Sequence, residues 1–99
     1  MNYAHFENEQ MRLCILQILN SDSDYAMNAL VISRAIEVQG YQPSFDKLKT
    51  EFAWLQEQGL VEYLNADTNV SVLKLTQRGS DVAQGRASVP GIPRPRPMP

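Results

Sequence analysis

The chain has a single cysteine, Cys14, and a single histidine, His5, among its 99 residues. One cysteine excludes an internal disulfide, and the two residues together are too few for a zinc knuckle or a histidine-rich metal site. Cys14 lies in the apolar segment 13–16, where we expect a small buried side chain rather than a reactive thiol. We therefore predict no metal and no cofactor.

Long apolar runs and enzyme motifs are also missing. No segment approaches the roughly 20 apolar residues that span a bilayer, and residues 1–6 lack the basic and apolar regions of a signal peptide. The sequence contains no nucleophile elbow, no glycine-rich phosphate loop and no metal-ligand spacing. We predict a cytoplasmic protein that is neither an enzyme nor a membrane protein.

Apolar residues recur at helical spacing in residues 8–19, 29–38 and 45–58. The first segment is apolar on nearly all sides, which is typical of a helix buried on several sides. It is either the central helix of the domain or a homodimer interface, and the sequence leaves both open. The second segment has an apolar face formed by Val31, Ile32, Ala35 and Ile36. The third has an apolar stripe formed by Phe45, Leu48, Phe52 and Leu55, and roughly the opposite side carries Lys47, Thr50, Glu51 and Trp54.

Shorter elements surround these helices. The sequence predicts a brief strand at 25–27 and a hairpin of strands at 60–64 and 70–75. A last short helix at 77–84 follows the capping residue Thr76. Helix starts are marked by capping residues and helix ends by glycines, namely Asn28, Ser44, Thr76, Gly40, Gly59 and Gly85. The predicted fold is mostly α with a small β-hairpin.

Proline changes the character of the chain near its end. Five of the six prolines fall between residues 90 and 99. Such a stretch is typically extended and poorly ordered. We predict one domain over residues 1–85 and a flexible Pro/Arg-rich tail over residues 86–99. The tail holds three arginines and no acidic residue, so it is locally basic.

Two segments carry a family resemblance. Residues 52–61, Phe-Ala-Trp-Leu-Gln-Glu-Gln-Gly-Leu-Val, resemble the junction between recognition helix and wing in winged helix-turn-helix proteins. Residues 73–79, Leu-Lys-Leu-Thr-Gln-Arg-Gly, are similar to the exit from their wing. Further matches at residues 12–13, 85–86 and 89–91 make nearly the whole chain resemble small winged-helix proteins of Mu-like phages and prophages. This resemblance implies a winged-helix fold and a bacterial host cell, and it brings no settled activity.

In winged helices that bind DNA, the third helix enters the major groove. The contacts would then come from exposed side chains near the start of that helix, with two further cations from elsewhere. These predicted DNA-binding residues are Ser44, Lys47, Lys49, Thr50, Arg34 and Lys74. The corresponding function is a phage-derived protein that binds double-stranded DNA, as a small regulator or a DNA-packaging accessory.

The distribution of charge argues against that function. The formal net charge is -2, and residues 44–58 hold two lysines against Asp46, Glu51 and Glu57. Phosphate neutralisation supplies most non-specific DNA affinity, so few free cations mean weak binding. The alternative is a winged-helix protein-interaction module that does not bind DNA. Its contact surface would be Trp54, the apolar first helix or the proline-rich tail. Trp54 has a further interpretation as a core residue under the hairpin or the last helix.

Overall fold

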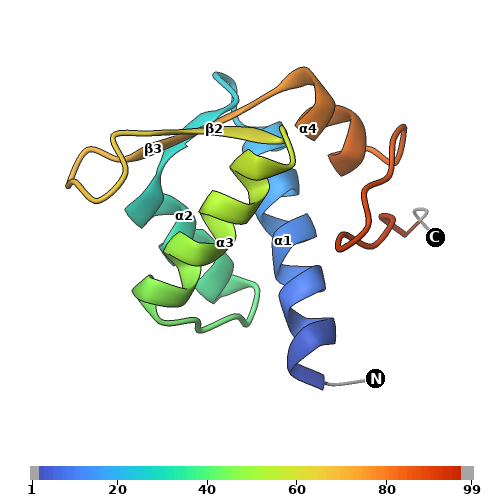
Figure 1. Ribbon diagram of the computed structural model, residues 1–99, viewed down its shortest axis with the longest axis horizontal. Helices are drawn as coiled ribbons and strands as arrows, with labels where there is room; N and C mark the ends of the chain where they lie inside the picture. Colours follow the sequence, from blue (N-terminus) through green and yellow to red (C-terminus); the bar gives the residue numbers. More distant parts are fainter. Residues whose placement is uncertain (1–2, 97–99) are drawn as a thin grey trace.

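The computed structural model describes residues 3–96, which form four helices and one antiparallel sheet (Figure 1). The elements in chain order are α1 (Tyr3–Ser21), β1 (Ala26–Asn28), α2 (Ala29–Val38), α3 (Phe45–Glu57), β2 (Val61–Leu64), β3 (Val72–Leu75) and α4 (Gln77–Ala83). The predicted α+β class and the predicted order of elements are confirmed. The largest difference is at α1, which begins at Tyr3 rather than near residue 8.

Side-chain caps fix where three of the helices begin. Ser44 Oγ accepts from the Lys47 amide at 3.1 Å, and Asn28 Oδ1 accepts from the Leu30 amide at 2.8 Å. Thr76 caps α4 in the same way. Each cap satisfies an amide that has no partner inside the helix, so the three predicted helix starts are confirmed.

The sheet has the order β1-β3-β2, so β3 pairs with a strand on each side. Leu73 and Leu75 of β3 are buried, whereas Lys74 between them is exposed. Because side chains alternate along a strand, Lys74 faces away from the helices. The outer edge of β2 is partly covered, since the Tyr63 amide donates to Gln56 Oε1 of α3 at 2.7 Å.

Helix α1 passes through the centre of the fold, against α2, β3 and α4 (Figure 1). From Met11 onward it buries one residue or more on every turn, at Met11, Leu13, Ile15, Leu16 and Leu19. This apolar part of the first helix is therefore covered within its own chain. A homodimer through these side chains would have to open the core.

Three side chains differ from their predicted burial. Phe45 and Val31 were expected on apolar faces but are exposed, because little of residues 3–96 packs over the first residue of α3 or the outer side of α2. Glu51 was expected on the exposed side of α3 but is buried. It faces α1, where Arg12 supplies an opposite charge.

The C-terminal segment, residues 86–96, packs on the domain. Val89 and Ile92 are buried and belong to the same core as α1 and α3. The segment is fastened further by Arg94 Nη2, which donates to the Gly85 carbonyl at 2.9 Å. The predicted poorly ordered tail is thus not confirmed for these residues, because two apolar side chains hold it against the core. Residues 97–99 of that tail lie outside the described part of the chain.

Candidate nucleic-acid interface

The start of α3 was the predicted DNA-reading surface, and its two hydroxyl groups are engaged with the helix itself. Ser44 Oγ is the cap described above. Thr50 Oγ1 donates to the Asp46 carbonyl at 3.2 Å. Both hydroxyl groups therefore form hydrogen bonds with the backbone of α3 itself.

The two lysines of α3 differ in their surroundings. Lys49 Nζ forms an ion pair and hydrogen bond with Asp67 Oδ1, which joins α3 to the β2–β3 loop. The hydrogen bond to Asp67, followed by its charge, raises the pKa of Lys49. Lys47 has no acidic partner within residues 3–96. Of the two, only Lys47 presents an unpaired charge, because Asp67 offsets the charge of Lys49 at the loop that a DNA-binding wing would use.

The remaining two predicted cations, Arg34 and Lys74, belong to α2 and β3. Arg34 Nη1 lies 3.7 Å from Glu37 Oε2 on the outer side of α2. Lys74 lies on the sheet face turned away from the helices, directly across from Glu62 of β2. The six predicted DNA-binding residues are thus spread over α2, the start of α3 and β3.

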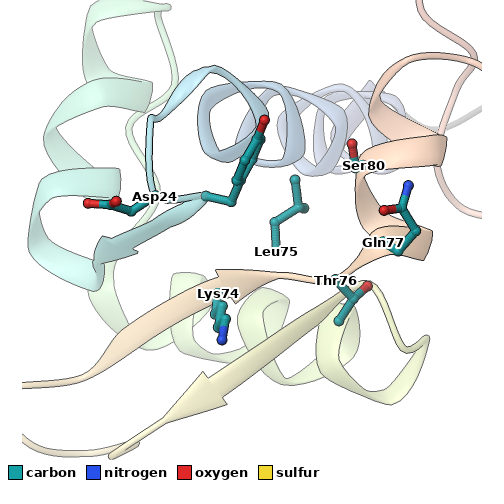
Figure 2. A pocket seen from close by; sticks show the side chains of 7 residues that line it. Asp24, Lys74, Leu75, Thr76, Gln77 and Ser80 are labelled. Carbon is teal, nitrogen blue, oxygen red and sulfur yellow. The ribbon is translucent and has the colours of Figure 1, made fainter.

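Lys74 also lines a groove of about 400 Å³ at the place where the residues before β1, the end of β3 and the start of α4 meet (Figure 2). The groove is also lined by Asp24, Tyr25, Leu75, Thr76, Gln77 and Ser80. Several of its polar groups already have partners in the chain: Thr76 Oγ1 donates to the Gly59 carbonyl and Ser80 Oγ donates to Asn20 Oδ1, each at 2.7 Å. These two hydroxyl groups are therefore engaged within the chain.

A buried charge cluster occupies the side of α3 that faces α1. Arg12 Nε donates to Glu51 Oε1 at 2.5 Å, and the two side chains are only 13% and 6% exposed. The guanidinium also lies over the Trp54 ring, 4.1 Å from its centroid, and donates from Nη1 to the Gly91 carbonyl at 3.1 Å. Arg12 thereby ties α3 and the C-terminal segment to α1, and it is not part of an exposed basic face.

Trp54 is half-buried and packs against the core, and the C-terminal segment lies against one edge of its ring. Gly91 lies so close that a Cβ there would come within 2.8 Å of Trp54 Cζ2. Gly91 also has a φ of +99°, a conformation that glycine adopts without strain. With one face on Arg12 and an edge against Gly91, the Trp54 ring is engaged within the chain and is not a free anchor for a partner.

Exposed apolar side chains lie on α2 and at the start of α3, the two helices that carry most of the predicted DNA-binding residues. Leu30, Val31 and Val38 of α2 are 57%, 51% and 85% exposed, and Phe45 at the start of α3 is 45% exposed. Leu30 and Phe45 line one small pocket together with residues of the β2–β3 loop. The one signal in the sequence was the excess of apolar residues in α2, which was assigned to the core.

Metal and membrane sites are not evident in residues 3–96. No three His, Cys, Asp or Glu side chains gather there as metal ligands, and no helix is long and apolar enough to cross a membrane. Cys14 is half-buried, and this burial raises the pKa of its thiol.

Comparison with known proteins places the chain in a phage setting. It is 39% identical over 89 residues to gp26, an uncharacterized protein of Escherichia phage Mu, covering 90% of this chain and 91% of that protein. The chain belongs to the gp26 family. A second relative, an uncharacterized protein of Haemophilus influenzae, is 30% identical over 78 residues, or 79% of this chain and 76% of that protein. This member of the gp26 family matches no protein-family model and no solved structure.

Proposed function

We propose that this gp26-family protein is a winged helix that works by binding another protein. The winged-helix assignment is supported by the order of elements, with β1 between α1 and α2 and the β2–β3 hairpin after α3. It is supported also by the central position of β3 in the sheet. Winged helices serve both DNA and protein partners, so the surface has to decide between them.

The observation that carries the proposal is the apolar surface of α2 and the start of α3. Four large apolar side chains, Leu30, Val31, Val38 and Phe45, are about half-exposed or more. Single exposed apolar residues are common on soluble proteins, but a grouped set marks a contact surface. The group covers the region where a DNA-binding winged helix would instead present cations.

Charge supports the same conclusion. Residues 1–75 contain ten acidic and five basic side chains, which gives a net charge of 5 − 10 = −5. Three of the five cations, Arg12, Arg34 and Lys49, are paired with acids. A surface with this excess of acidic side chains repels DNA phosphates, and it has few unpaired cations to neutralise them.

DNA binding remains a second candidate, supported by a different region. Residues 76–99 contain four arginines and one aspartate, which gives a net charge of 4 − 1 = +3. Arg86, Arg94 and Arg96 are exposed in the C-terminal segment. Contact with phosphates would then come from this segment rather than from α3, and it would serve a regulator or a packaging accessory.

Two experiments separate the candidates. Tagged protein is recovered from host cells that carry the phage genome, as wild type and as the Val31→Ser/Phe45→Ser variant. A partner retained by the wild type and lost by the variant is the expected result. Leu64→Ser removes an exposed apolar side chain from the sheet and is the matched control. If the wild type and both variants retain the same partner, the partner does not bind at the proposed surface.

The second experiment is a salt titration of binding to random duplex DNA. Lys47→Glu/Lys49→Glu is compared with Arg86→Glu/Arg94→Glu. We expect no salt-sensitive binding that depends on the lysines. Binding abolished only by the arginine variant supports the second candidate, and binding abolished by the lysine variant restores the α3 interface.

A further inference from the structure

The outer side of α2 has an unusual composition for a solvent-exposed helix face. At about 100° per residue, five of its residues fall within an arc of about 120°. We call this set the α2 face, and it consists of Leu30, Val31, Arg34, Glu37 and Val38. All five are exposed, whereas Ala29, Ile32 and Ile36 on the opposite arc are buried. The α2 face is therefore mostly apolar and uncovered within its own chain.

The two charged members of the α2 face neutralise each other. Arg34 and Glu37 lie one turn apart, 3.7 Å between Nη1 and Oε2, with side chains 81% and 47% exposed. Because the two charges offset each other, a partner that covers this face needs an apolar surface with no net charge. A second copy of the chain meets this demand without further adjustment, because in a two-fold interface the same patch lies on both sides.

We propose that the α2 face binds the α2 face of a second copy, forming a two-fold symmetric dimer. An antiparallel arrangement centred between residues 34 and 35 places Val31 against the partner's Val38, since both lie equally far from the centre. The same arrangement sets the two Arg34 side chains beside each other at the two-fold axis, with the partner's Glu37 within one turn of each. Each copy then buries its valines and shares its ion pair with the other copy.

Neighbouring residues extend the dimer surface. Leu30 and Phe45 border the α2 face at its N-terminal end, where they line one pocket. The middle of α1 is not a competing surface, because its residues Met11, Leu13, Ile15, Leu16 and Leu19 are already buried, whereas Tyr3 and Phe6 at its start are exposed. This inference rests on the proposed function, of which it names the partner as a second copy of the chain.

Charge exchange at the α2 face tests the dimer specifically. Arg34→Glu gives every copy two acids at this face, and Glu37→Arg gives every copy two cations. Sedimentation equilibrium should show a dimer for the wild type and monomers for each variant alone. An equal mixture of the two variants should form a heterodimer, and the double variant Arg34→Glu/Glu37→Arg should dimerise again. Circular dichroism checks that each variant is folded. We expect every variant to fold, because both positions are exposed.

Two results would overturn the dimer. One is a wild type that stays monomeric at the highest concentration reached. The other is dimerisation of both single variants as strong as that of the wild type, which would place the interface elsewhere. A monomeric wild type that still loses a cellular partner on Val31→Ser/Phe45→Ser removes the dimer and keeps the proposed function. If the wild type is monomeric and no cellular partner depends on Val31 and Phe45, the dimer and the proposed function are both wrong.

Discussion

The Arg12–Glu51 cluster and the α2 face both differ from the burial that residue type alone predicts. Between α1 and α3, two charges are buried, whereas on α2 three large apolar side chains are exposed. The buried charges are compensated, because Arg12 has Glu51, the Trp54 ring and the Gly91 carbonyl as partners. The exposed apolar side chains have no such compensation within residues 3–96. The first region therefore serves the fold, and the second is the surface that we propose for contact with another chain.

The largest expected effect is at the buried cluster. Glu51→Ala leaves the Arg12 guanidinium buried without its anion, and breaking such a pair destabilises by about 3–5 kcal/mol. Urea unfolding measures the loss. Glu57→Ala removes an exposed acid from the same helix and should change stability by under about 0.5 kcal/mol. Equal effects of the two substitutions would mean that Glu51 is not buried against Arg12.

The next effect tests whether the C-terminal segment belongs to the fold. Ile92→Ala removes a buried side chain and should destabilise by about 2–3 kcal/mol, the lower part of the usual range, because the segment can partly collapse onto the space. Ser88→Ala changes an exposed residue of the same segment and is the control. If thermal unfolding of the two variants is the same, residues 86–96 do not pack on the core.

A smaller effect is expected on the α2 face. Val38→Ser removes an exposed side chain at similar helix propensity, so stability measured at low protein concentration should change by under about 0.5 kcal/mol. Ile36→Val removes a single methylene from the buried side of the same helix and should lose about 0.5–1.5 kcal/mol. A larger loss for Val38→Ser than for Ile36→Val would show that Val38 is needed for folding.

The smallest effect concerns the ion pair between α3 and the β2–β3 loop. Asp67→Asn should lower the pKa of Lys49 toward its ordinary 10.5, measured by an NMR titration of the lysine side chain. Because folding raises the pKa of Lys49, the pair stabilises the fold below pH 10.5, and this contribution is lost as the pH rises through the raised pKa. An unchanged pKa would mean that the two side chains do not meet in solution.

The elements were predictable from the sequence because their signals are local. Caps at Asn28, Ser44 and Thr76 and glycines after the helices fix boundaries within a few residues of themselves. The Arg12–Glu51 pair was not predictable, since its members are 39 residues apart and only tertiary packing brings them together. Composition also misled at the C-terminal segment, where the prolines obscured two buried side chains.

The candidate site was harder to predict than the fold. Residues for DNA contact were chosen by type and position, and the structure engages Ser44 as a cap and pairs Lys49 with Asp67. The exposed surface of α2 could not be told from a core face, because a helix with apolar residues on two sides does not reveal which side is covered. Only the packing of α1 and β1 on one side of α2 decides that question.

Amide chemical shifts of the wild-type protein, followed by NMR as its concentration is raised, test the central claim most directly. The account predicts changes concentrated at Leu30, Val31 and Val38, with the amides of Lys47 and Thr50 little affected. Shifts that do not change with concentration anywhere on α2 would contradict it, and so would changes confined to the start of α3.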